Sequence, residues 1–225
     1  MLMLPFAARS CAPFSLDIST GGKEDVVIRI IDVLIAAAAI AMLLPLLLLV
    51  GAMIWASDGQ PPLFFQRRIG LGGRSFRCLK FRTMACDADR QLAALIAYSP
   101  AILACWRRHH KLAGDPRITP LGRLLRVASI DELPQLLNVI AGDMSLVGPR
   151  PIVASEVPRY GRHFATYCHR RPGLSGLWQV SGRSTLSYAR RLACDRLFAR
   201  RCSLALYCRI LLATVPTVLL ARGAC

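Results

Sequence analysis

Two adjacent acids, Asp131 and Glu132, are the residues of this chain best suited to chemistry. An ionised Asp can act as a nucleophile in phosphoryl transfer. A second carboxylate suits Mg²⁺, which usually binds one or two protein carboxylates together with phosphate oxygens. The same residues also fit a helix start, in which Asp131 is the N-cap or Ser129 and Glu132 form a capping box. Both interpretations place the acid pair at the N-terminus of a helix, where the helix dipole stabilises a carboxylate and attracts phosphate.

Basic residues with the chemistry of phosphate ligands precede and follow this acid pair in the sequence. Several lie in segments rich in Gly and Pro, where a backbone can approach a ligand closely. An Arg can hold a phosphate with two parallel hydrogen bonds. The same cations could instead form a solvated face or contact anionic lipid. The candidate phosphate ligands are Lys80, Arg126, Arg150 and Arg183.

His and Cys give no metal or nucleophile signature. His109 and His110 have no acid close in sequence, so we expect them at the surface. None of the nine Cys forms a CxxC pair, and tight paired spacing is what zinc sites use. We therefore expect reduced thiols packed as small hydrophobic side chains.

The composition points to a membrane or to an anionic ligand. The chain has 225 residues, with 29 Lys and Arg against 13 Asp and Glu, which gives a net charge of +16. Hydrophobic residues make up 54%, which excludes a disordered chain. A chain that is both apolar and basic suits a lipid surface or phosphate-bearing partners.

An uncharged segment, Val33 to Trp55, is long enough as a helix to cross a bilayer core. Pro45 lies in its middle and predicts a kink, because proline lacks an N–H and clashes with the preceding turn. The segment either spans the membrane with a kink or bends and returns on the same side. The residues from Gly59 to Cys86 are basic without an acid, which places the bulk of the protein in the cytoplasm.

The remaining elements follow from pattern and turn residues. Residues 63–69 and 75–81 alternate around four residues that include three glycines and predict a hairpin. We expect helices over 87–111, 119–126 and 131–140, a segment rich in loops over 148–182, and a helical stretch over 187–220.

Three motifs then make the chain recognisable. They read FRCLKFRTM (76–84), IDELPQLLNVIAGDMSLVGPRP (130–151) and RRPGLSGLWQVSGRS (170–184). With the membrane segment, the chain resembles the bacterial polyprenyl-phosphate sugar-1-phosphate transferases over residues 26–225. These are monotopic phosphoglycosyl transferases, and the likeness is greatest to the short exopolysaccharide members that transfer galactose- or glucose-1-phosphate.

The resemblance implies an α+β, mainly helical protein with a re-entrant helix kinked at Pro45, a small β-hairpin and a cytoplasmic helical catalytic body on the inner membrane. It divides the chain into a tail (1–25), a membrane helix (26–57) and a catalytic domain (58–225). It also implies an Asp131–Glu132 dyad that binds Mg²⁺. It further implies that UDP-hexose is the donor, undecaprenyl phosphate the acceptor and UMP the product. The implied reaction passes through a phosphosugar on Asp131.

Three positions differ from the family pattern. Leu44 replaces a usual Ser, Phe198 a usual Tyr, and Tyr207 a usual acid twelve residues after Asp195. The alternatives to an enzyme are a membrane-anchored scaffold and a basic nucleic-acid-binding protein, although no nucleic-acid motif is present. We expect membrane lipid and no nucleic acid as partners, and we allow for a homodimer.

Overall fold

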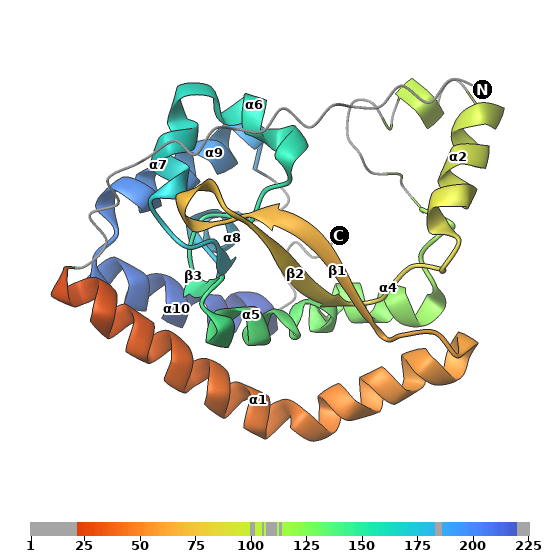
Figure 1. Cartoon of the computed structure of the whole chain (residues 1–225), viewed down its shortest axis with the longest axis horizontal. Coiled ribbons are helices and arrows are strands. Elements are labelled where there is room, and N and C mark those ends of the chain that lie inside the picture. Colours follow the sequence, from red (N-terminus) through yellow and green to blue (C-terminus); the bar gives the residue numbers. More distant parts are fainter. Residues whose placement is uncertain are drawn as a thin grey trace.

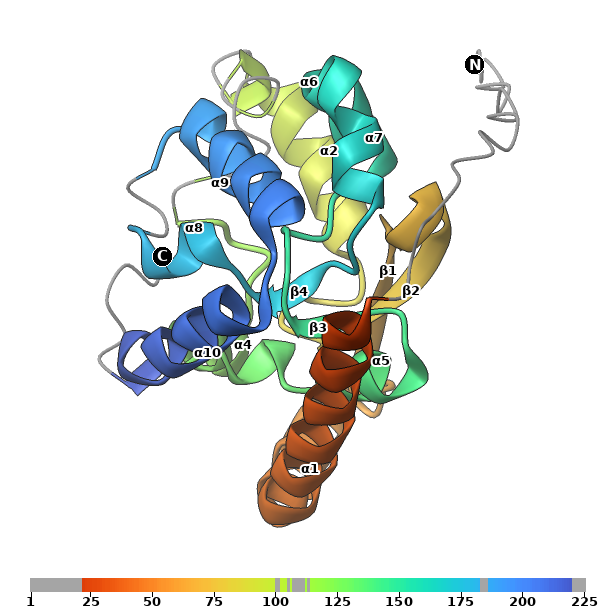
Figure 2. The same ribbon diagram turned by 90° about the vertical axis from the view of Figure 1, so that its left-hand side faces the viewer.

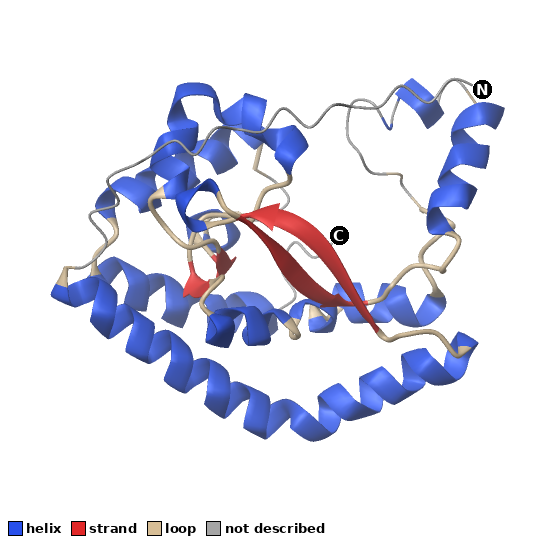
Figure 3. Ribbon diagram, viewed as in Figure 1, coloured by secondary structure: helices blue, strands red, loops and turns tan. Residues whose placement is uncertain are grey.

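The computed structural model describes residues 22–99, 102–104, 106, 112, 114–182 and 186–219. It is mainly helical, as predicted, with two small sheets (Figure 3). The α-helices are α1 (Lys23–Asp58), α2 (Ala88–Tyr98), α4 (Pro120–Val127), α5 (Gln135–Ala141), α6 (Val157–Tyr160), α7 (Phe164–Cys168), α8 (Leu177–Val180), α9 (Tyr188–Arg201) and α10 (Leu204–Leu219). The strands are β1 (Leu63–Ile69), β2 (Ser75–Phe81), β3 (Ser145–Val147) and β4 (Gly173–Ser175). Short 3₁₀ turns are η1 (Leu71–Gly73), η2 (Ile130–Glu132), η3 (Ala154–Glu156) and η4 (Gly161–His163).

The first helix, α1, is a single bent element of 36 residues with Pro45 inside it. Figure 1 shows that it runs down and away from the body, turns in its middle and rises again, so that both ends lie on the side of the body. Figure 2 shows that it projects beyond the other helices. It is long and apolar enough to cross a membrane. The expected bend is present, because an internal proline breaks the helical hydrogen-bond ladder.

Contacts of α1 with the body are confined to its two arms. Ile28 and Ala36 are buried in the first arm, and Val50 and Ile54 in the second. Ile28 and Ala36 are eight residues apart with the buried Asp32 between them, and Val50 and Ile54 are four apart, so each set lies on one helix face. Between the arms lie exposed apolar side chains such as Met42, which is 75% exposed. The helix therefore presents an apolar bend with exposed side chains on one face, while Leu46 and Leu47 pack against the core.

The predicted hairpin is confirmed. β1 and β2 pair antiparallel, with Leu63 opposite Phe81. The connection uses positive φ at Gly72 and Gly73, which glycine adopts without strain. The long hairpin crosses the centre of the molecule (Figure 3).

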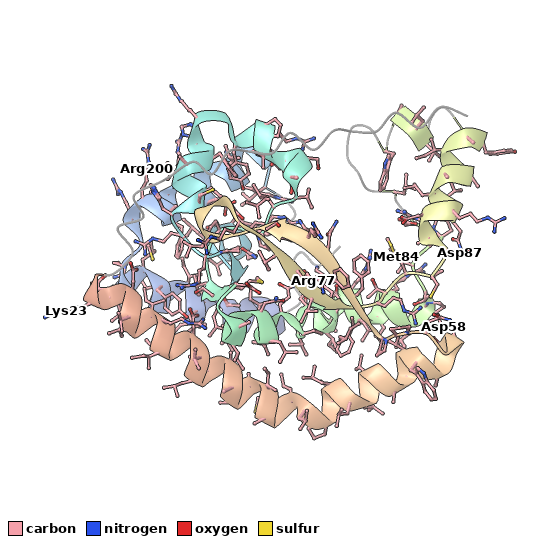
Figure 4. The ribbon with its side chains drawn as sticks, viewed as in Figure 1. Lys23, Asp58, Arg77, Met84, Asp87 and Arg200 are labelled. Atoms are coloured by element: carbon pink, nitrogen blue, oxygen red, sulfur yellow. The ribbon has the colours of Figure 1, made fainter. Side chains whose placement is uncertain are left out.

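The hairpin is also fastened to the end of α1. Arg82 donates from two nitrogens to the Asp58 carboxylate, at 2.5 and 2.6 Å. Figure 4 shows Asp58 at the point where α1 gives way to the hairpin. This pair fixes the second arm of α1 relative to β2.

A second sheet lies where loops were expected. β3 and β4 pair in parallel, Ser145 opposite Gly173 and Val147 opposite Ser175. A side chain at Gly148 would meet the carbonyl oxygen of Arg171 at 2.3 Å, so this close approach of two backbones requires glycine. The 148–182 segment, which was expected to be rich in loops, therefore contains one short strand, β4, and the short helices α6, α7 and α8.

The expected helical stretch 187–220 is two helices, since the chain breaks between α9 and α10 at Cys202 and Ser203. α10 packs on α1 and on the second sheet. Within 87–111, α2 ends at Tyr98. His109 and His110 lie outside the described residues. The six described cysteines are free thiols, and Cys78 and Cys168 are buried as expected, whereas Cys86 is exposed.

Candidate active site

The acid pair lies in the 3₁₀ turn η2 and not at the start of a long helix. Ser129, directly before it, has a left-handed backbone (φ 58°) and makes no side-chain cap. The following α-helix, α5, begins only at Gln135, after Pro134. The helix predicted over 131–140 is therefore present but starts at Gln135, and both capping interpretations are wrong. A left-handed non-glycine residue costs energy, and such strain is concentrated at functional sites.

Lys80 of β2 reaches both acids. Its Nζ lies 2.5 Å from Glu132 Oε1 and 3.9 Å from Asp131 Oδ2. Asp131 is buried, with 8% of its surface exposed, and Glu132 is half-buried. The structure therefore brings the predicted catalytic acids together with one predicted phosphate ligand.

Asn138 fixes this arrangement from α5. Its side-chain Oδ1 accepts the N–H of Leu79 at 2.9 Å, and its Nδ2 donates to the carbonyl of Arg77 at 2.7 Å. The buried amide thereby continues the hydrogen bonding of β2 on its open edge. Because Leu79 directly precedes Lys80 in β2, Asn138 helps to set the position of the lysine relative to the acid pair. Sequence reasoning missed this role, since only the pairing of β2 with α5 reveals it.

Arg126, at the end of α4, lies on the Asp131 side of the site. Its Nε donates to the Thr83 hydroxyl at 2.9 Å. Thr119 is the N-cap of α4, and its hydroxyl accepts the N–H of Gly122 at 2.9 Å. This cap and the bond to Thr83 orient Arg126 while leaving its terminal nitrogens without a described partner.

The two carboxyl groups are tuned in opposite directions. Burial raises the pKa of Asp131, an effect that Lys80 opposes and the neighbouring Glu132 adds to. Burial would also raise the pKa of Glu132, but Lys80, by charge and hydrogen bond, lowers it below its ordinary value, with help from Arg150. Asp131 therefore binds a proton more readily than Glu132 does. A carboxylate with a raised pKa is the better nucleophile once it is ionised.

Arg150 follows β3 in the Gly148–Pro151 loop. Its backbone N–H donates to Asp195 Oδ1 at 3.2 Å, and Tyr160 donates to the other oxygen of that carboxylate at 2.8 Å. Burial raises the pKa of Asp195 to about 7. Asp195 belongs to α9, so its function in holding this loop could not be read from the sequence.

The chemistry of the donor set fits Mg²⁺. Asp131 and Glu132 offer adjacent carboxylates, and no group of three or more His, Cys, Asp or Glu side chains that could hold a metal exists among the described residues. Two carboxylates completed by substrate phosphates are a usual arrangement for Mg²⁺. Arg183 lies outside the described residues.

The residues that differ from the family pattern lie away from the acid pair. Phe198 and Tyr207 are buried together with Ile28 of α1. Tyr207 donates to Asp32 of α1 at 2.7 Å, and Leu44 is exposed on α1. Tyr207 therefore belongs to the attachment of α1 and not to the acid pair.

Two adjacent carboxylates beside a lysine and an arginine form a site of the phosphoryl-transfer class. Comparison with known proteins makes this specific. The model of the bacterial sugar transferases matches residues 23–221, and the chain belongs to this family. It is a transferase, which decides in favour of the enzyme over the scaffold and the nucleic-acid-binding protein.

Relatives with assigned activities cover most of the chain. Exopolysaccharide production proteins ExoY of Sinorhizobium fredii and Rhizobium meliloti are 48% and 44% identical, over 87% and 96% of this chain and 86% and 98% of theirs. The UDP-glucose:undecaprenyl-phosphate glucose-1-phosphate transferase of Caulobacter vibrioides is 43% identical, over 85% of this chain and 69% of its own. The undecaprenyl-phosphate galactose phosphotransferase of Salmonella typhimurium is 44% identical, over 74% of this chain and 35% of its own.

Proposed function

We propose that the enzyme transfers a hexose-1-phosphate from a UDP-hexose to undecaprenyl phosphate, releases UMP and thereby starts exopolysaccharide assembly. The observation that carries the proposal is the contact of Lys80 with both Asp131 and Glu132 in a chain of this family. Two relatives carry undecaprenyl-phosphate transferase in their names, one for glucose and one for galactose. Glucose and galactose are therefore the sugars to test first.

The chemistry follows from Asp131. In the first step a carboxylate oxygen of Asp131 attacks the sugar-bearing phosphorus, an O–P bond forms, and the bond to the UMP oxygen breaks with its electron pair. In the second step an oxygen of undecaprenyl phosphate attacks the same phosphorus, and the Asp131–phosphorus bond breaks. The carboxylate is restored, and the product is a lipid diphosphate sugar.

Lys80 and Arg126 supply the positive charge that lets an anionic nucleophile approach a phosphate. This function replaces the helix N-terminus that the sequence suggested, because α5 begins four residues after Asp131. Glu132 holds Lys80 in position through the 2.5 Å contact. Asp131 and Glu132 would hold Mg²⁺, which neutralises phosphate oxygens when bound.

For the membrane, we propose that the apolar bend of α1 enters the cytoplasmic leaflet of the bacterial inner membrane and returns. The bent helix with both arms on the body supports this topology. In a variant whose only cysteine is Cys11, a membrane-impermeant thiol reagent should label intact cells only after permeabilisation. Labelling of Cys11 from outside would show that α1 spans. This membrane topology of α1 is the same whether the protein is a monomer or a homodimer.

The covalent step is tested with UDP-glucose and UDP-galactose in the absence of lipid. The wild-type enzyme should release about one UMP per active site and carry a hexose phosphate detectable by mass spectrometry. Asp131→Asn should fold and lose both signals, whereas Asp89→Asn, which changes an exposed acid of α2, should keep them. UMP release that requires undecaprenyl phosphate, without any adduct, would reject the two-step route.

A further inference from the structure

The Arg150 loop, residues 148–152, has an acceptor for each of its backbone N–H groups. Its two prolines carry no N–H and have a fixed φ. The other three N–H groups donate to a carbonyl of β4, to the Asp195 carboxylate and to the hydroxyl of Tyr167. The structure therefore holds the backbone at Arg150 in one position, and two of the three acceptors are side chains, from α9 and α7.

Tyr167 places its hydroxyl inside the contact between this loop and β1. Ile69, the last residue of β1, forms an antiparallel bridge with Ile152 and donates its N–H to the carbonyl of Ile152 at 2.8 Å. In a regular antiparallel pair, the N–H of Ile152 would return a bond to the carbonyl of Ile69. Here the Tyr167 hydroxyl lies between these two groups, since it accepts from Ile152 at 3.4 Å and donates to Ile69 at 2.8 Å. The loop is thus joined to the hairpin by one direct bond and by one bond relayed through Tyr167.

The ring of Tyr167 is held by its packing. Tyr167 is buried, with 2% of its surface exposed. Its ring stacks on Phe164 with the ring centres 6.2 Å apart, and the ring of Tyr160 meets it edge-on at 5.2 Å. α7, which carries Tyr167, also packs on the hairpin turn η1. Because the ring is packed between two others, its hydroxyl has a fixed place relative to the hairpin.

The strand that receives the loop belongs to the same hairpin as Lys80. Directly opposite residues of two paired strands share a face, and so do alternate residues along one strand. Arg68 of β1 is opposite Phe76, four residues before Lys80 in β2, so Arg68 and Lys80 lie on one face of the hairpin. From this face Arg68 Nη1 donates to the carbonyl of Pro151 at 2.9 Å. The hairpin therefore connects the Arg150 loop to Lys80, and through Lys80 to the acid pair.

We infer that Tyr167 is a positioning residue of the transfer reaction, because its hydroxyl sets the Arg150 loop against the hairpin that carries Lys80. The inference rests on the proposed function and on Arg150 as a phosphate ligand within it. An arginine forms two parallel bonds to a phosphate only from a backbone in the right place. Tyr167 acts through the loop, since its hydroxyl is occupied by the two backbone groups.

A double-mutant cycle tests whether Tyr167 acts through Arg150. Tyr167→Phe removes one oxygen and keeps the ring contacts. It should lower kcat/KM for the UDP-hexose about fivefold, the size of one ordinary hydrogen bond. Arg150→Gln should lower kcat/KM as well, and Tyr167→Phe should cause no further loss in the Arg150→Gln background. Tyr98→Phe, which changes an exposed tyrosine of α2, should retain the wild-type kcat/KM.

Hydrogen exchange measured by mass spectrometry reports the same contact without turnover. In Tyr167→Phe the amide of Ile152 should exchange faster than in the wild type, because it loses its acceptor. The amide of Leu79, which donates to Asn138, should exchange at the wild-type rate. Faster exchange at both amides would show a general loss of stability and would reject the positioning role.

Three further results would overturn the inference. They are losses that multiply in the double variant, equal kcat/KM in Tyr167→Phe and Tyr98→Phe, and an Ile152 amide whose exchange does not change. If the wild type turns over neither UDP-glucose nor UDP-galactose, the proposed transfer fails, and exchange at Ile152 still decides whether Tyr167 holds the loop. Turnover by the wild type together with multiplying losses rejects the positioning role alone.

Discussion

Tyr207 donates a hydrogen bond of 2.7 Å to Asp32, and this contact joins α10 to α1. The same carboxylate oxygen accepts the hydroxyl of Ser145 at 3.0 Å and the N–H of Leu146 at 2.7 Å. Asp32 is 1% exposed and Tyr207 is fully buried. A single carboxylate thus attaches the apolar helix to the second sheet and to α10.

Replacing Tyr207 by Phe removes one donor from this carboxylate without changing the shape of the core. Because Ser145 and Leu146 still donate to Asp32, we expect a loss of about 0.5–1.5 kcal/mol in the free energy of unfolding, the usual net contribution of one hydrogen bond. Thermal unfolding in detergent measures it. The control is Tyr98→Phe, since Tyr98 is 90% exposed. Equal stability of the two variants would show that the Asp32 contact contributes nothing.

Asn138→Ala should impair both stability and catalysis. It leaves the N–H of Leu79 and the carbonyl of Arg77 without partners, at a cost of about 1–3 kcal/mol for each group that stays buried. Because Lys80 loses its fixed position, kcat should also fall. Chemical denaturation and steady-state UMP release measure the two effects. Gln60→Ala removes an exposed amide and should change neither. Full activity in Asn138→Ala would contradict the positioning of Lys80 by Asn138.

The pH dependence of the first step should report the raised pKa of Asp131. Only the ionised carboxylate attacks, so the single-turnover rate of UMP release should rise with pH, with a midpoint above the ordinary range of an Asp. Lys80→Met removes the largest opposing effect and should move this midpoint to still higher pH. Arg74→Gln, an exposed charge change at the other end of the hairpin, should leave it in place. A downward shift in Lys80→Met would contradict this assignment.

Asp195 should make stability fall as pH rises. Its pKa is about 7 in the folded protein against 3.8 for the ordinary group. The folded state therefore holds the proton that the unfolded state loses, and this contribution, complete below pH 4, is lost as pH rises towards 7. We measure the free energy of unfolding at several pH values between 4 and 7. In Asp195→Asn this free energy should depend less steeply on pH than in the wild type. An unchanged slope would mean that Asp195 is ionised throughout this range.

Sequence reasoning succeeded where the signal was local. The hairpin ends were predicted because alternating residues flank a glycine-rich turn, and Pro45 predicted a bend within α1. The helix expected over 131–140 is present, but its predicted start was wrong because Ser129 adopts a left-handed backbone and Pro134 precedes the first residue of α5. Neither effect follows from helix propensity.

The distant parts of the site could not be predicted. Lys80 meets Glu132 across 52 residues, and Asp195 meets the Arg150 loop across 45. The acid pair and Lys80 could be selected from the sequence by their chemistry and by the family motifs. Arg191 and Asp195 lie in α9, and the spacing of residues along that helix does not reveal which elements it packs against. The packing of α9 on α7 and α8 decides that placement.

The position of Asp32 has a consequence for biosynthesis. Its three partners, Ser145, Leu146 and Tyr207, are all synthesised more than one hundred residues later. While the ribosome is still translating the catalytic part, the apolar bend of α1 is ready to meet lipid but the Asp32 carboxylate has no partner and must remain in water. The apolar bend of α1 can therefore insert into the bilayer early. The helix becomes attached to the rest of the enzyme only when translation has passed Tyr207.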